Sequence, residues 1–239
     1  EWLPSKPVWS NYAEVFRAPN PLSANTMGLA LSMLLHPLLS TATVGKLMLS
    51  FYLVGVPATF VALALAFGRS PWLAFLTLPM VFNGILSVGF LNYLFGLPLL
   101  FGSLALARVF AEQGGAKRGI GLALLLVACY FAHMIVFLIA LGMVGALIVL
   151  FINRRSGISR LAVLIPALPF LIGWVARMFG SGAWAWSPGG KGLGLVFKGL
   201  EVRLAQIHLW GMQFFRDSVD ERVFAVLAGC WLFLLALGC

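Results

Sequence analysis

Few residues in this chain of 239 could carry out acid–base chemistry. It has only seven acidic side chains, and all of them fall at expected loops or helix ends: Glu1, Glu14, Glu112, Glu201, Asp217, Asp220 and Glu221. A transporter driven by protons or sodium usually holds its ion with a carboxylate inside an apolar span, or with the carbonyls of a broken helix. The position of the acids therefore argues against coupled transport.

One ionisable side chain does lie deep in an apolar run, namely His133 in YFAHMIVF. A residue of this kind is a candidate functional group, but a neutral histidine satisfied at a helical turn is an equally good interpretation. His36 and His208 are interpreted as structural. No Ser/His/Asp arrangement, Gly-rich phosphate loop, HExxH motif or CxxC spacing occurs, so the sequence predicts no metal site and leaves the identity of any cofactor open.

Cations gather with tryptophans in the polar stretch 181–222, which follows Arg177. One interpretation is an amphipathic helix lying on the membrane surface, anchored by its aromatic side chains. The other is that cations near the lipid head groups bind the phosphate or pyrophosphate of a lipid-linked substrate. The residues that would do so are Arg177, Lys191, Lys198 and Arg203, with His133 as a further candidate for substrate binding.

The composition assigns the chain to the membrane class. Hydrophobic residues make up 62% of it and charged residues only 10%, which is far too little polar surface for a soluble domain of this length. The net charge of +9 comes from basic residues that mostly separate apolar runs. Topology and lipid head groups explain such charges better than nucleic acid does.

The stretch from Asn83 to Arg108 is predicted to be a central membrane-spanning helix. Small and polar residues recur along it at heptad-like spacing, which places them on one face: Gly89, Asn92, Gly96 and Ser103. Such a face allows another helix to approach closely, and it gives the Asn92 amide a partner across the contact. We therefore expect this stretch to lie inside an all-α bundle.

The other apolar runs indicate about seven spans in all. Leu47 to Gly68 and Leu161 to Phe179 each read as one span, whereas Ser23 to Thr43 reads better as a short helix at the surface. The uncharged run Gly119 to Ile152 would be about 50 Å long as one helix, and it has a basic pair at each end. A hairpin that turns near His133 puts both pairs on the same side of the membrane.

The expected organisation has four parts. Residues 1–22 form an interfacial segment, 23–180 the transmembrane bundle, 181–222 an external amphipathic segment, and 223–239 the start of a further span. Because the chain begins with Glu and ends inside an apolar run, we expect it to be a fragment of a larger protein.

Part of the chain resembles a family of bacterial polytopic membrane proteins. The resemblance covers roughly Pro19 to Ile152 and rests on GFLNYLFGLPLLFGSLALA, on the Asn six residues before it, on YFAH and on APNPLSANTMGLALSMLL. The family's arrangement is similar to the type C glycosyltransferase superfamily, whose members span the membrane many times and use polyprenyl-phosphate-linked sugars as donors. That superfamily implies an acidic catalytic residue in an external loop after the first helix, and we expect this region to be absent or truncated in the present sequence. The related family often has an acid where Asn25 stands, and Glu14 is then the nearest candidate for the general base.

The resemblance implies a multi-pass protein of the bacterial inner membrane that transfers a sugar from a polyprenyl-phosphate donor at the external face. The sequence leaves two other functions open. One is a non-catalytic subunit that docks a membrane protein partner through the central helix. The other is a flippase-like transporter of lipid.

Overall fold

The computed structural model describes residues 23–81, 86, 91–151, 158–180 and five positions between 222 and 230. In this part of the chain every regular element is a helix. The elements are α2 (Met27–Leu35), α3 (Thr41–Ala66), η2 (Pro71–Thr77), α4 (Leu78–Val81), α6 (Leu91–Gln113), α7 (Ala116–Ala132), α8 (Met134–Phe151), η3 (Ile158–Ala167) and α9 (Leu168–Gly180).

Four helical stretches of the described residues are long and apolar enough to cross a membrane: Ala42–Ala66, Leu91–Gln113, Met134–Phe151 and Ser159–Arg177. They make the chain a multi-pass integral membrane protein. The α7 helix has 17 residues, which is the short end of what a bilayer requires. The expected count of about seven spans is not reproduced within the described ranges, and most of 223–239 lies outside them.

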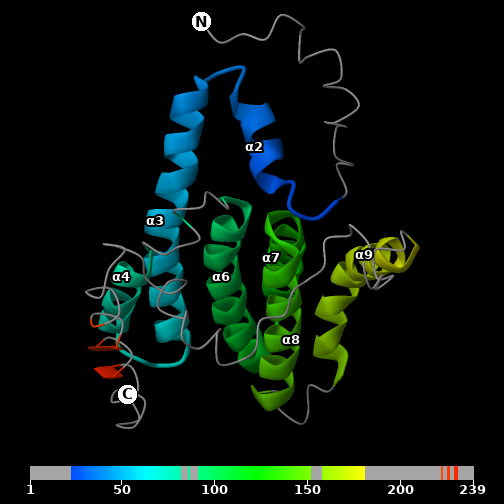
Figure 1. The fold of residues 1–239 in the computed structure, drawn as a ribbon. Coiled ribbons are helices and arrows are strands. Elements are labelled where there is room, and N and C mark those ends of the chain that lie inside the picture. Colours follow the sequence, from blue (N-terminus) through cyan, green and yellow to red (C-terminus); the bar gives the residue numbers. More distant parts are fainter. Residues whose placement is uncertain are drawn as a thin grey trace, which may run out of the picture.

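The α6 helix lies at the centre of the bundle, with α3 on one side and the α7–α8 pair on the other (Figure 1). The start of α8 lies against the start of α6, where Gly96 faces Val136. The ends of the same two helices meet where Arg108 stacks on Phe151. Hence α6 and α8 run in the same direction, and α7, which connects them in the sequence, runs in the opposite direction.

The predicted hairpin is confirmed, because α7 ends at Ala132 and α8 begins at Met134. His133 between them is extended, with φ −161° and ψ 131°. No glycine or proline marks this break in the sequence. The turn is instead held by a distant residue, since the Oδ1 of Asn25 accepts a hydrogen bond from the N–H of Met134 at 3.1 Å.

Two helix boundaries differ from the prediction. The α3 helix begins at Thr41 rather than Leu47, because the Oγ of Ser40 accepts from the N–H of Thr43 and caps the helix. The central helix was expected to end at Arg108, but α6 continues to Gln113. Its described part begins at Leu91, and Asn83 lies outside the described residues.

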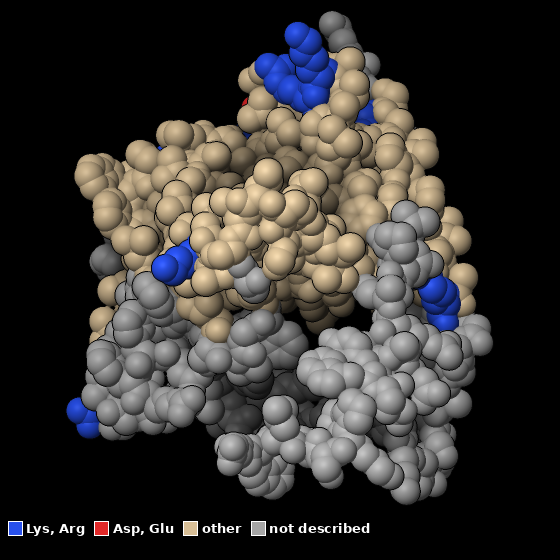
Figure 2. Space-filling view, turned by 90° about the horizontal axis from the view of Figure 1, so that it is seen from above, with Lys and Arg blue, Asp and Glu red and all other residues tan. Residues whose placement is uncertain are grey.

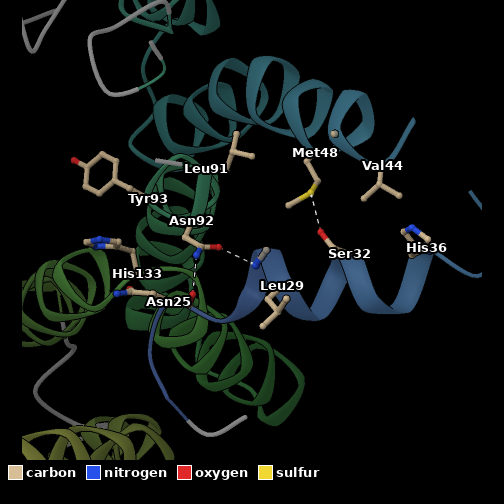
Figure 3. Close-up of a pocket in the computed structure, with 12 residues that line it drawn as sticks. Asn25, Leu29, Ser32, His36, Val44, Met48, Leu91, Asn92, Tyr93 and His133 are labelled. Carbon is tan, nitrogen blue, oxygen red and sulfur yellow. Dashed lines mark hydrogen bonds between the residues drawn. The ribbon is translucent and has the colours of Figure 1, made fainter. Parts of the chain in front are cut away.

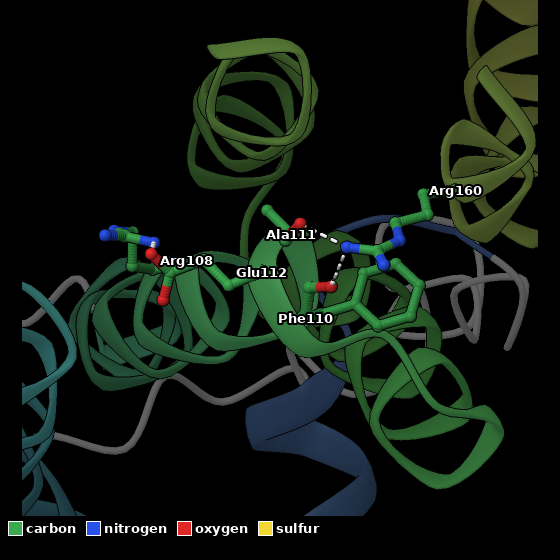
Figure 4. A network of polar contacts seen from close by, with 5 residues as sticks. All are labelled: Arg108, Phe110, Ala111, Glu112 and Arg160. Carbon is green, nitrogen blue, oxygen red and sulfur yellow. Dashed lines mark hydrogen bonds and ion pairs between the residues drawn. The ribbon is translucent and has the colours of Figure 1, made fainter. Parts of the chain in front are cut away.

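The last turns of α6 explain why it runs on past Arg108. The guanidinium of Arg108 forms an ion pair with Glu112 and lies 4.0 Å from the ring centroid of Phe151 and 5.5 Å from that of Phe67. Arg160 of η3 donates from Nη1 to the carbonyls of Phe110 and Ala111 at the end of the helix (Figure 4). Basic side chains thus stabilise the carbonyl end of α6.

The structure also contains helices where a short helix and a further span were predicted, in Ser23 to Thr43 and Leu161 to Phe179. The α2 helix has only nine residues, as expected of a segment that does not cross. The predicted span Leu161 to Phe179 is helical throughout, and its geometry changes from 3₁₀ to α between Ala167 and Leu168, beside Pro166 and Pro169.

Basic residues are unevenly divided between the two ends of the bundle. Arg69, Arg108, Lys117, Arg118 and Arg160 lie at the end where α3, α6 and α8 finish, whereas Lys46 and Arg177 lie toward the other end. Seen from above, from the end where α2 lies, most of the described surface is neither basic nor acidic, and Lys and Arg stand at its margin (Figure 2). We call the end with Arg69, Arg108, Lys117, Arg118 and Arg160 the basic end of the bundle.

Candidate ligand site

A cavity of about 580 Å³ opens at the end of the bundle opposite the basic end. Four parts of the chain meet there: α2 with the turn before it, the first turns of α3, the start of α6, and the α7–α8 junction (Figure 3). The lining residues are Asn25, Gly28, Leu29, Ser32, His36, Val44, Gly45, Met48, Leu91, Asn92, Tyr93 and His133.

Asn92 joins α6 to the beginning of α2. Its Oδ1 accepts from the N–H of Gly28 at 2.8 Å, and its Nδ2 donates to the carbonyl of Asn25 at 2.7 Å. The first N–H groups of a helix have no partner within the helix. Thr26, at the N-cap of α2, does not supply one, because its hydroxyl donates back to Ser23. Asn92 therefore acts as the cap of α2 from a distant part of the chain.

Asn25 plays the same part for α8. Its backbone is left-handed, with φ 65°, a conformation that asparagine tolerates better than most residues. This geometry allows the side-chain oxygen to reach the N–H of Met134, the first residue of α8. The two asparagines thus connect α2, α6 and α8 at one place, and they shape the cavity between these helices.

Three polar atoms at this end of the cavity have no hydrogen-bond partner among the described residues: Nδ2 of Asn25, the hydroxyl of Tyr93 and Nε2 of His133. The rings of Tyr93 and His133 meet edge to face, with centroids 5.2 Å apart. The Nδ1 of His133 accepts from the N–H of Ile135 at 3.3 Å, which leaves Nε2 as the protonated nitrogen of the neutral ring. Burial lowers the pKa of this imidazole and keeps it neutral.

The other end of the cavity is mainly apolar. It runs between α2 and α3 along Leu29, Val44 and Met48, and Ser32 donates there to the sulfur of Met48 at 3.7 Å. Tyr93 and His133 stand at one end of the row of lining residues, and His36 and Val44 at the other (Figure 3). The described lining residues include no Asp, Glu, Lys or Arg. The cavity therefore offers uncharged hydrogen-bonding groups at one end and an apolar channel at the other.

The structure separates the residues of the predicted packing face. Asn92 reaches α2, as described above. Gly96 faces α8, where an added methyl group would lie 2.7 Å from a methyl of Val136. Ser103 is fully buried, donates to the carbonyl of Leu99 and touches the sulfur of Cys129 in α7. Gly89 lies outside the described residues.

Of the two predicted substrate-binding residues that the structure describes, His133 lines the cavity and Arg177 does not. Arg177 lies on α9, where its Nε donates to the carbonyl of Gly173 on the same helix at 3.1 Å. Glu14, Lys191, Lys198 and Arg203 lie outside the described residues. Among the residues that the structure describes, no three His, Cys, Asp or Glu side chains lie close enough together to hold a metal ion.

Sequence reasoning did not assign Asn25, Gly28 or Tyr93 to a site. A signal was present, because Asn25, Asn92 and His133 belong to the three separate segments on which the family resemblance rests. That these segments meet at one cavity is a finding of the structure.

Comparisons of this chain with protein-family models, curated proteins and solved structures give no match. What the site can do is therefore argued from its own residues. The four apolar helices establish a multi-pass membrane protein. The uncharged polar end and the apolar channel of the cavity favour a ligand that has both a polar and an apolar part.

Proposed function

We propose that this membrane protein binds a lipid-linked molecule with a hydroxyl-rich head group, such as a polyprenyl-phosphate-linked sugar. The observation that carries the proposal is the cavity with an uncharged polar end at Asn25, Tyr93 and His133 and an apolar channel between α2 and α3. Sugar hydroxyls donate and accept hydrogen bonds. Nδ2 of Asn25 and Nε2 of His133 can donate to them, and the Tyr93 hydroxyl can both donate and accept. A prenyl or acyl chain matches the apolar channel.

The depth of the cavity supports this ligand. Val44 lies within the first turn of α3 and His133 directly precedes the first residue of α8, and each residue of a helix adds only about 1.5 Å along its axis. The cavity therefore lies near the level of the lipid head groups, where the polar part of a lipid-linked sugar would lie. A route across the membrane would instead place its polar groups near mid-span.

The basic end supports an orientation. Positive side chains accumulate on the cytoplasmic side of membrane proteins. With the basic end inside, the cavity opens toward the external face. This is the face at which the resemblance to type C glycosyltransferases implies that transfer takes place.

The finer proposal is sugar transfer from the lipid donor to an acceptor hydroxyl. In this step the bond between the anomeric carbon and the phosphate oxygen breaks, and a bond from that carbon to the acceptor oxygen forms. The acceptor proton passes to a carboxylate, and polyprenyl phosphate leaves. The described cavity has no carboxylate, so we assign the base to Glu14. We assign the binding of the phosphate to Arg177, Lys191, Lys198 and Arg203.

Binding and transfer can be tested separately on the full chain in nanodiscs. The binding assay compares polyprenyl-phosphate sugars with polyprenyl phosphate that lacks the sugar, by native mass spectrometry. We expect the sugar-bearing lipid to bind more tightly. Tyr93→Phe and His133→Phe should each weaken its binding by about 2- to 13-fold, which corresponds to one hydrogen bond, without changing the binding of the sugar-free lipid.

A matched control is Tyr130→Phe, which removes a hydroxyl that does not line the cavity. Equal binding of the two lipids, or equal losses in Tyr130→Phe and Tyr93→Phe, would overturn the proposed ligand. The transfer assay then compares the native chain with Glu14→Gln. Loss of turnover with retained binding supports the enzyme, whereas binding without turnover for every donor indicates a flippase-like carrier or a non-catalytic subunit.

A further inference from the structure

A second cavity, of about 610 Å³, lies at the basic end of the bundle. One wall is formed by the end of α6, the α6–α7 turn and the first turns of α7, and the other by η3. Its residues include Phe110, Gly119, Ala123, Arg160, Val163 and Pro166. None of the residues that line the cavity near α2 takes part in it.

Small side chains keep this cavity open. Gly119 and Ala123 line it from α7, and Ala162 lines it from η3. The turn that starts α7 depends on Gly114 and Gly115, with φ of 64° and 100°, values that favour glycine. The result is a groove between two membrane helices, open at the end of the bundle and bounded by apolar residues farther along.

The mouth of the groove is positively charged. Arg160 lines it, and a smaller hollow bounded by Lys117 and Arg118 adjoins it, because the two cavities share Gly115 and Ala116. The Nη1 of Arg160 is used by the carbonyls of α6, but Nε and Nη2 of the same side chain have no hydrogen-bond partner among the described residues. The one acidic residue described near this end, Glu112, is paired with Arg108 on another face of α6 (Figure 4).

We propose that this groove is a binding site for an anionic phospholipid. The lipid phosphate lies against Arg160, Lys117 and Arg118, and one acyl chain lies between α7 and η3. Basic pockets between membrane helices on the cytoplasmic side suit anionic head groups, and a groove that continues into the span suits a hydrocarbon chain. A soluble anion would match the charges but would leave the apolar part of the groove empty. The site is independent of the proposed sugar-lipid cavity, which lies at the opposite end.

The test uses the full chain in nanodiscs that contain equal amounts of phosphatidylglycerol and phosphatidylcholine. Retained lipid is counted by native mass spectrometry after transfer to detergent. We expect phosphatidylglycerol to be retained preferentially. The double variant Lys117→Gln/Arg118→Gln should lower this preference by about 30-fold, because each cation near the surface contributes about fivefold.

The matched control is Lys46→Gln, which removes one positive charge from an exposed residue at the other end of the bundle and should leave the preference unchanged. The single variant Lys117→Gln removes the same charge at the groove and should lower the preference about fivefold. Arg160 is not substituted, because it also caps α6. The groove itself is tested with Ala162→Phe, since Ala162 is exposed and its enlargement fills the groove without disturbing the core. This variant should lower retention of phosphatidylglycerol at least fivefold.

Four results would overturn the proposal. The first is equal retention of the two lipids by the native chain. The second is an equal effect of Lys46→Gln and Lys117→Gln, which would reflect net charge alone. The third is displacement of the lipid by millimolar inorganic phosphate, and the fourth is unchanged retention by Ala162→Phe. Either of the last two would mean that only the head group is bound.

Discussion

Asn92→Ala should release α2 from the bundle. The substitution removes the acceptor that caps Gly28 and the donor that binds the carbonyl of Asn25, at 2.8 and 2.7 Å. Loss of a helix N-cap costs about 0.5–2 kcal/mol, and loss of a second hydrogen bond about 0.5–1.5 kcal/mol. The sum is roughly 1–3.5 kcal/mol, and it falls on α2 because the helix is short and Gly28 is its one buried residue.

The assay is hydrogen exchange by mass spectrometry on the full chain in nanodiscs. Amide protection in 27–35 should fall by roughly 5- to 400-fold, the equivalent of this energy, while protection in α6 changes little. Asn92→Asp is the informative companion, because the carboxylate still accepts from Gly28 and carries a charge that suits a helix N-terminus. It should cost less protection than Asn92→Ala.

A matched control for this experiment is Ser32→Ala, which removes only the long contact of a hydroxyl with the Met48 sulfur at 3.7 Å. Protection of α2 should then change by less than about twofold, since surface and weakly bonded positions contribute little. Unchanged protection in Asn92→Ala, or an equal loss in Ser32→Ala, would refute the idea that a distant side chain caps α2.

Three further predictions concern stability, measured by thermal unfolding in detergent. Gly96→Ala should cost about 1–3 kcal/mol because the new methyl lies 2.7 Å from Val136, and adding Val136→Ala should recover part of this loss. The control is Gly142→Ala, which has open space beside it and should not change the stability. Equal costs at the two glycines would contradict close packing of Gly96 against Val136. Burial lowers the pKa of His133, so the unfolded chain takes up a proton first as the pH falls; stability should decline below about pH 6.5, and His133→Asn should reduce the decline. Arg108→Gln removes a cation stacked on two rings and should cost about 0.5–2 kcal/mol. An unaltered midpoint temperature of unfolding would show that the stacking contributes nothing to stability.

The helices were largely predictable because their signals are local. Apolar length identifies a span wherever it occurs, and this predicted the α3, α6, α8 and Ser159–Arg177 stretches. Even the break at His133 followed from charge, since basic pairs at both ends of one long run require a turn. Helix ends were less predictable, because the cap at Ser40 and the stacking of Arg108 depend on polar contacts that the average hydropathy of a stretch of sequence does not register.

The site was much less predictable than the helices. Heptad spacing gave Asn92, Gly96 and Ser103 a common face, but the structure assigns them to three different neighbours, α2, α8 and α7. Spacing shows which residues share a face and does not show how many helices that face meets. Arg177, chosen for its charge, does not line the cavity, whereas the uncharged Tyr93, which no charge pattern could indicate, does.

By itself the sequence determined the environment and the course of the chain: an apolar, weakly charged polypeptide that must cross a membrane several times and turn near His133. Only the tertiary structure decided where the polar side chains work. The first N–H groups of α2 and α8 need acceptors, and any nearby asparagine, serine or threonine could supply them. The fold selects Asn92 and Asn25, and the choice gathers three distant segments around one cavity. The physical reason is that the unpaired N–H groups at the start of a helix require a hydrogen-bond acceptor, whereas the packing of the helices determines which residue supplies it.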